Sequence, residues 1–174
     1  MLSVGSSNLL TGNTATGNLR CGYVVFQAPR NTLRGNIATA NSIGGFILAE
    51  AGAQMNTLED NLAEHNDGTG FALHQSSGNV LRNNIGSGNG DNGFSAFRSG
   101  TNILERNSAE ANEANGFHIN ESPSNTFDGN RAADNGHNGL VLVNSDGNVL
   151  RHNAANANSQ HGYVLVAPES MNNT

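Results

Sequence analysis

The residues of this sequence that could do chemistry recur at intervals of 23. His118 could act as a general base, Arg98 could pair with a carboxylate of a ligand, and Phe97 could stack on a ligand ring. The catalytic candidates are His118, His74, Arg98 and Glu121, and the ligand-binding candidates are His74, Ser95, Phe97, Arg98, His118 and Asn120. Side chains spaced in this way can form one site only if the fold stacks successive 23-residue segments on each other.

The spacing belongs to a repeat that runs through the chain, with the consensus N-x-L-x-x-N-x-A-x-x-N-x-x-x-G-F-x-L. Repeat units begin at Asn8, Asn31, Asn56, Asn79, Asn102, Asn125 and Asn148, and another starts at Asn173. Two steps are 25 residues long, and their extra residues lie at the end of the unit, before Asn56 and before Asn173. A repeat of this length predicts a solenoid, in which each unit buries its apolar side against its neighbours.

Four positions of the unit are invariant. Counted from the first Asn, positions 1, 6 and 11 are always Asn and position 15 is always Gly. If each unit forms one coil, equivalent residues stack about 4.8 Å apart, and Asn side chains can pass hydrogen bonds along the column. Asn also tolerates the left-handed backbone of a corner. The Gly indicates a corner where a Cβ would clash or φ must be positive.

Between these positions the apolar residues alternate with a period of two, as in strands. Positions 3, 8, 16 and 18 are apolar and supply the core, and no amphipathic helix of useful length is present. Position 16 is occupied by Tyr23, Phe46, Phe71, Phe94, Phe117, Leu140 and Tyr163. We therefore predict an all-β protein: a single-stranded parallel β-helix of about seven coils of 23–25 residues. Each coil has three short strands with Asn ladders at the turns, and residues 1–174 form a single domain.

The units resemble the repeat of the right-handed, pectate-lyase-like β-helix superfamily, with a match that extends from about Asn8 to Ser170. That superfamily includes pectin-active lyases and hydrolases, alginate epimerases, phage tailspikes and periplasmic NosD-type repeat proteins. The resemblance implies sugars as the ligand class and an extracellular or periplasmic setting, although no signal peptide is visible. The chain departs from the enzymes because it has no Lys base, no paired-Asp hydrolase signature, no Asp-Pro-His-Asp epimerase motif and no long loop.

Composition excludes several partners. The formal charge is −6, with no Lys and eight Arg, which argues against binding to nucleic-acid backbones. No apolar run is long enough to span a membrane. The single Cys21 excludes an internal disulfide, and we interpret it as a turn residue of the first coil.

Acidic residues gather near the third corner of the coils. The metal-ligand candidates are Glu64, Asp67, Asp91, Glu110 and Glu113, with Asp134, His65 and His137 nearby. Such oxygen ligands could hold a hard cation such as calcium. The alternative interpretation is that these are solvated corner residues, and no other cofactor is expected.

Position 4 carries charges of alternating sign on most neighbouring units: Arg34, Glu59, Arg82, Glu105, Asp128 and Arg151. Opposite charges on adjacent strands attract each other modestly. We interpret this column as a surface ladder that helps to set the register, and not as a site.

Positions 17 and 19 should point outward and form a stripe that is apolar at both ends. The interface candidates are Val24, Phe26, Ile47, Val141, Val143, Val164 and Val166, and the centre is interrupted by His74, Ser95, His118 and Asn120. Contiguous exposed apolar surface usually marks a contact site. The stripe, and ends without an evident cap, favour self-association as a homodimer or higher oligomer. The alternatives are that β-branched residues simply favour strands and that the chain is a segment of a longer solenoid.

Two functions remain open on the sequence alone. The first is a non-catalytic β-helix scaffold that self-associates and binds carbohydrate or polysaccharide. The alternative is a polysaccharide-active enzyme, either a uronate lyase, an epimerase or a glycoside hydrolase, that uses the outward strand face. Both predict a polysaccharide partner, no nucleic acid and no membrane.

Overall fold

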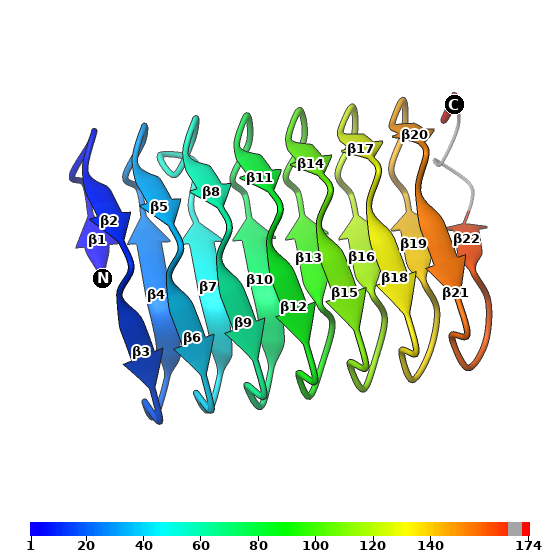
Figure 1. Cartoon of the computed structure of the whole chain (residues 1–174). Helices are drawn as coiled ribbons and strands as arrows, with labels where there is room; N and C mark the ends of the chain where they lie inside the picture. Colours follow the sequence, from blue (N-terminus) through cyan, green and yellow to red (C-terminus); the bar gives the residue numbers. More distant parts are fainter. Residues whose placement is uncertain (167–171) are drawn as a thin grey trace.

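The computed structural model describes residues 1–166 and 172–174 and shows a solenoid of stacked coils. Each coil contributes one short strand to each of three parallel sheets, and successive coils lie side by side from the N-terminus onward (Figure 1). The predicted all-β parallel solenoid of about seven coils is confirmed. No helix occurs in the described part of the chain, so none there could cross a membrane.

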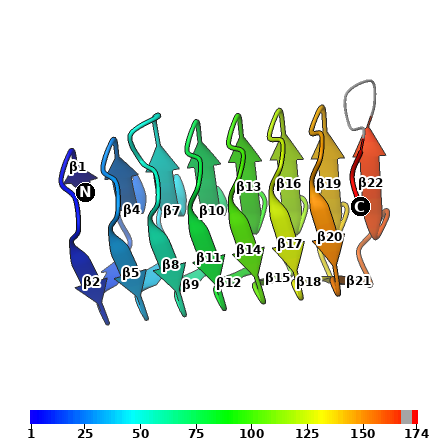
Figure 2. The same cartoon turned by 90° about the horizontal axis from the view of Figure 1, so that it is seen from above.

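The three sheets enclose the buried residues of the core. Figure 2 shows the same stack of coils from above. Sheet A contains β1 (Leu2–Ser3), β4 (Cys21–Phe26), β7 (Gly44–Ala49), β10 (Thr69–His74), β13 (Phe94–Phe97), β16 (Phe117–Asn120), β19 (Leu140–Val143) and β22 (Tyr163–Val166). Sheet B contains β2 (Leu9–Thr11), β5 (Thr32–Arg34), β8 (Thr57–Glu59), β11 (Val80–Arg82), β14 (Ile103–Glu105), β17 (Thr126–Asp128) and β20 (Val149–Arg151). Sheet C contains β3 (Thr14–Thr16), β6 (Ile37–Thr39), β9 (Leu62–Glu64), β12 (Ile85–Ser87), β15 (Ser108–Glu110), β18 (Arg131–Ala133) and β21 (Ala154–Asn156).

Strand register follows the repeat. Phe71 of β10 pairs with Phe94 of β13, which pairs in turn with Phe117 of β16. The two extra residues of the second coil, Ala51 and Gly52, are accommodated in the wider loop between β7 and β8 (Figure 1), where Gly52 packs against the backbone of Gln27 in the first coil. Equivalent positions of all coils therefore remain stacked.

The core contains a continuous aromatic column at position 16. The rings of Tyr23, Phe46, Phe71, Phe94 and Phe117 stack with centroid separations of 4.6–4.9 Å and interplanar angles of 4–12°. Such offset stacking adds to the stabilisation that comes from burial of the rings. Position 3 packs beside this column and position 8 supplies small residues, as the sequence predicts.

The predicted Asn ladders are present at positions 1, 6 and 11. In the second ladder, Oδ1 of Asn84 accepts hydrogen bonds from the backbone N and from Nδ2 of Asn61, both at 3.0 Å. Nδ2 of Asn84 donates to the carbonyl of Leu58 at 2.9 Å and to Oδ1 of Asn107 at 3.0 Å. Each side chain thus pairs its own buried amide and a backbone group of a neighbouring coil, which removes the cost of burying them.

The backbone conformations at the corners correct one expectation. The left-handed residue is not the ladder Asn but the residue before it, as in Asp60, Asn83 and Arg106 with φ of 53–55°. The invariant Gly does not need a positive φ. A Cβ on Gly45 would lie 2.5 Å from the carbonyl oxygen of Gly70 and 2.7 Å from Cβ of Ala63. Position 15 is therefore Gly because it packs directly against the small residue at position 8.

Two further ladders were not predicted. Ser76, Ser99, Ser122 and Ser145 link coils three to six through bonds from each backbone N to the next hydroxyl, all at 3.0 Å. Asn92, Asn115 and Asn138 form a ladder of opposite polarity, in which each backbone N donates to the preceding side chain. Coils four to six are thus the most densely linked of the solenoid.

Candidate functional site

The outer face of sheet A brings together the polar residues in the middle of the stripe. The register places His74, Phe97 and Asn120 on adjacent strands β10, β13 and β16, and it places Ser95 beside His118. Parallel strands lie about 4.8 Å apart. The predicted candidates from three repeat units therefore share one small surface.

Four residues form a compact cluster there, which we name the Phe97 patch: His74, Phe97, Arg98 and Glu121. The His74 ring meets the Phe97 ring edge-on, with centroids 6.3 Å apart. The guanidinium carbon of Arg98 lies 4.7 Å from the Phe97 centroid, within cation–π range. Nε of Arg98 donates to Oε2 of Glu121 at 2.7 Å. The patch thus combines an aromatic face with both signs of charge.

The corner backbone orients the charged members of the patch. Arg98 and Glu121 follow β13 and β16 with φ of 50° and 48°, and their side chains are 55% and 41% exposed. An ion pair this exposed stabilises a fold by about 1 kcal/mol at most. The pair is consequently free to rearrange for a ligand at little cost to the protein.

His118 is half-buried on the same face. Burial lowers the pKa of its imidazole below the ordinary value, and the nearby Asp91 carboxylate offsets part of that shift. The ring is therefore neutral near pH 7 and can accept a proton. Within residues 1–166 and 172–174, no hydrogen bond joins His118 to His74, Arg98 or Glu121. The catalytic candidates share a face without forming a linked acid–base pair.

Asn120 sits beside Phe97 in the adjacent strand and is half-buried. Its Oδ1 atom is buried and has no hydrogen-bond partner in the described part of the chain. Ser95 is also half-buried. These two residues contribute a polar floor next to the patch, and neither is widely open to solvent.

The apolar stripe is less exposed than its outward orientation suggests. Val141 is only 7% exposed, whereas Val166 at the end of the described coils is 40% exposed. The remaining interface candidates, Val24, Phe26, Ile47, Val143 and Val164, are half-buried. Side chains stacked at the strand spacing shield each other, so an outward position in a β-helix is only partly accessible.

The acidic candidates at the third corner are dispersed. Glu110 is held by Ser108 and Arg131, and these contacts lower the pKa of its carboxyl group. Asp91 accepts hydrogen bonds from Thr69 and Asn92 at 2.7 and 2.8 Å.

Other members of this acidic set line a hollow of about 250 Å³, which is bordered by His65, Asn66, Asp67, Gly88, Gly90 and Glu113. In the described ranges, no three His, Cys, Asp or Glu side chains converge as metal ligands. Calcium binding therefore remains a prediction, because no preformed group of ligands is present in this part of the structure. The last candidate, Glu64, has its Oε2 atom 4.0 Å from Nδ1 of His65.

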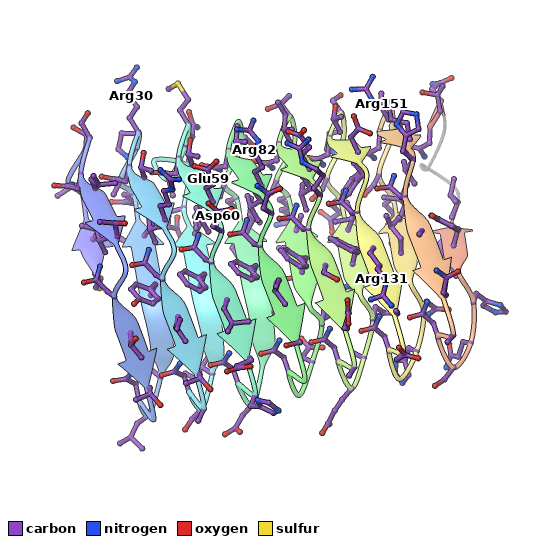
Figure 3. All side chains as sticks on the ribbon, in the orientation of Figure 1. Arg30, Glu59, Asp60, Arg82, Arg131 and Arg151 are labelled. Atoms are coloured by element: carbon purple, nitrogen blue, oxygen red, sulfur yellow. The ribbon has the colours of Figure 1, made fainter. Side chains whose placement is uncertain are left out.

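The charge column on sheet B forms ion pairs between coils. Arg82 contacts Glu105 at 3.0 Å, and Arg151 contacts Asp128 at 3.1 Å. Figure 3 shows Glu59 and Arg82 on neighbouring coils of this ridge, whereas Arg131 lies apart from it. The predicted inter-coil pairing is confirmed for these residues.

Cys21 differs from its predicted role. It is the first residue of strand β4 and not a turn residue, because sheet A begins earlier in the first three coils than in the later ones. It is half-buried, and burial raises the pKa of its thiol.

The family model for a right-handed β-helix region matches residues 1–85 and 47–174. The chain belongs to the right-handed β-helix family. The family match agrees with the resemblance to right-handed β-helices that the repeat indicates. Comparison with curated protein sequences gives no match.

Several solved β-helix structures share the fold. The A-module of the Azotobacter vinelandii mannuronan C-5 epimerase AlgE6 is 15% identical, with a TM-score of 0.85 over 95% of this chain and 54% of its own. A double mutant of the periplasmic alginate epimerase AlgG is 18% identical, with a TM-score of 0.71 over 95% of this chain and 45% of its own. The Azotobacter vinelandii AlgE4 A-module is 14% identical, with a TM-score of 0.58 over 84% and 56%.

The chain spans about half the length of these structures. At such low identity the likeness establishes the fold and not the activity. For a β-helix, function depends on the side chains that the scaffold presents, and the Phe97 patch with its polar neighbours is the candidate site on this chain.

Proposed function

We propose that this β-helix is a non-catalytic scaffold that binds polysaccharide on the outer face of sheet A. The observation that carries the proposal is the Phe97 patch, in which a half-exposed ring is bordered by Arg98, Glu121 and His74. A sugar ring has apolar C–H faces and hydroxyl edges. An aromatic face beside charged donors and acceptors matches both features.

The structural neighbours support sugars as the ligand class by analogy. Three of them are named as epimerases of alginate or mannuronan and share this fold over most of the chain. An extended polymer also suits the shape of the face, since sheet A continues through every coil on both sides of the patch. A chain of several sugars could lie along it.

The same geometry favours binding over catalysis. Arg98 is already paired with Glu121, and His118 is not hydrogen-bonded to either. A lyase or epimerase needs a base positioned against the substrate and a group that stabilises the developing charge. The alternative function remains a uronate lyase, epimerase or glycoside hydrolase with His118 as the proton acceptor.

Affinity electrophoresis in gels that contain polymannuronate or a neutral β-glucan tests the proposal. Phe97→Ala should abolish the retardation of the protein. Ile103→Ala is the control, because Ile103 is a large apolar side chain that is 42% exposed but lies on sheet B, away from the proposed site. Equal loss in both variants, or no retardation of the native chain by either polymer, would contradict the proposal.

The ion pair distinguishes an anionic ligand from a neutral one. Glu121→Gln removes the intramolecular partner of Arg98, so retardation by polymannuronate should increase if Arg98 contacts the uronate carboxylate. Retardation by a neutral glucan should not increase. Incubation of the native chain with polymannuronate in D₂O tests the enzyme alternative. Deuterium incorporation at C5 would establish an epimerase, an unsaturated product a lyase, and new reducing ends without unsaturation a glycoside hydrolase.

We also infer that the scaffold self-associates through the two apolar ends of the stripe. Phe26 and Ile47 at one end and Val143 and Val164 at the other each retain accessible surface on the same face. Light scattering across a dilution series tests this, and Val143→Glu should weaken the association. Val143 is chosen over Val141 because Val141 is only 7% exposed, so a charge there would also destabilise the fold. Val149→Glu on sheet B is the control. A native chain that remains monomeric when concentrated would refute self-association.

A further inference from the structure

Five Asn–Gly dipeptides occur in coils four to six: Asn89–Gly90, Asn92–Gly93, Asn115–Gly116, Asn135–Gly136 and Asn138–Gly139. In this dipeptide the glycine nitrogen is unhindered and can attack the Asn side-chain Cγ. A C–N bond forms, ammonia leaves, and water then opens the cyclic imide to aspartate or isoaspartate. We propose that these five dipeptides are covalent modification sites that react only when their coils open and then prevent refolding.

The folded backbone restrains every attacking nitrogen. The amide of Gly136 donates to the carbonyl of Asn112 at 2.8 Å, one coil away. The other four glycine amides donate in the same manner at 2.8–3.0 Å: Gly90 to Asn66, Gly93 to Asn115, Gly116 to Asn138, and Gly139 to His161. Attack requires the nitrogen to lose its proton, and a proton held in a ladder hydrogen bond is not free to leave.

The Asn side chains are restrained as well. Asn135 is fully buried, and its Oδ1 accepts from the backbone N and Nδ2 of Asn112 at 3.1 and 2.9 Å. Its Nδ2 donates to the carbonyl of Ala109 at 3.1 Å and to Oδ1 of Asn158 at 2.8 Å. Rotation of Cγ toward the glycine nitrogen would break these bonds together. The reaction must therefore wait until the coil opens.

The product cannot re-enter the ladder. An aspartate at position 135 has no N–H for the Ala109 carbonyl or for Oδ1 of Asn158, and it would bury a negative charge against two acceptor oxygens. Isoaspartate adds a main-chain atom, which displaces the strand register. Chemical modification of an opened state is a general route to irreversible unfolding, and here it acts within the ladder itself.

The fold fixes one residue of each dipeptide. Position 15, which holds Gly93, Gly116 and Gly139, must be Gly because a Cβ on Gly116 would lie 2.7 Å from both Cβ of Ala132 and the carbonyl oxygen of Gly139. Position 11, which holds Asn89 and Asn135, must be Asn because its side chain belongs to an Asn ladder. Coils four and five also carry β13 and β16 of the Phe97 patch, so modification would remove that surface.

Peptide mapping by mass spectrometry tests the inference with the whole chain, incubated at mildly alkaline pH either folded or in urea. Asn112 is the internal control, because it has the same ladder position and bonds as Asn135 but precedes Glu113. All five dipeptides should react at least about tenfold more slowly in the folded chain. In urea they should react ahead of Asn112. Equal rates in the folded and unfolded chain would overturn the proposal.

A second measurement tests the block to refolding. The fraction of circular-dichroism signal recovered on removal of urea should fall as the five sites become modified. Asn135→Asp, which imitates one product, should fail to regain the native signal, whereas Asn156→Asp at an exposed strand position should regain it. Native refolding of Asn135→Asp, or equal failure of both variants, would overturn the block.

Discussion

The Asn ladder predicts a large effect from a single small substitution. Asn84→Ala removes four hydrogen bonds, two accepted from Asn61 and two donated to Leu58 and Asn107. Each such bond contributes about 1 kcal/mol net, and an unsatisfied buried partner costs roughly 1–3 kcal/mol. Because Asn84 is fully buried, water cannot replace the lost partners. We expect the free energy of unfolding to fall by about 4–6 kcal/mol.

Equilibrium unfolding in urea, followed by far-ultraviolet circular dichroism, measures this effect in a chain that has no Trp. Asn8→Ala is the control, since Asn8 is exposed and its side chain donates one ladder hydrogen bond, from Nδ2 to Oδ1 of Asn31 at 2.9 Å. That variant should lose about 1 kcal/mol or less. If Asn84→Ala proves no more destabilising than Asn8→Ala, the ladder contributes register but little stability, and the reasoning fails.

Three further predictions concern the core and the candidate site. Gly45→Ala introduces a Cβ 2.5 Å from a carbonyl oxygen and should cost about 1–3 kcal/mol or more; Gly35→Ala meets no atom within 4 Å and should cost only about 1 kcal/mol, from its positive φ. A lower urea midpoint for Gly45→Ala than for Gly35→Ala would show that the steric clash costs more than the positive φ. Phe71→Ala removes a ring stacked on both sides and should cost about 3–5 kcal/mol in the same assay. The pKa of His118 is lowered by burial, so its NMR titration midpoint should lie below about 6.5. The unfolded chain then binds that proton more tightly, so stability is lost as pH falls below about 6.5, and His118→Gln should reduce the loss.

The architecture could be predicted because its determinants recur in every unit. Seven units all have Asn at positions 1, 6 and 11, Gly at position 15 and an apolar residue at positions 3 and 16. Comparison of the units within one sequence therefore shows which positions are constant. The register follows because only one alignment stacks Phe71 on Phe94 and also keeps Asn84 on Asn107. Strand number and core composition then follow from the period-two alternation between corners.

The features that were missed occur in only part of the repeat. The Ser ladder begins at Ser76 because the same position holds Ala28 and Ala53 in the first two coils, and so its signal is diluted. The left-handed corner position accepts residues as different as Asp60 and Arg106, which share a backbone angle but no side-chain property. The exposure of the outward side chains could not be predicted from the sequence either. Val141 points outward but is only 7% exposed in the stacked coils.

The candidate site was predicted from the places where the repeat departs from its own pattern. An outward column that is apolar in the outer coils carries the polar residues His74 and Asn120 in coils three and five, on either side of Phe97. Those coils gain nothing in core packing from the change, since all three side chains lie outside the aromatic column. Because these substitutions do not improve core packing, any effect that they have must arise at the protein surface. The cation–π contact and ion pair of Arg98 show that neighbouring coils arrange these side chains into one cluster. In a β-helix, the constant positions determine the scaffold and the varied outward positions determine what it binds.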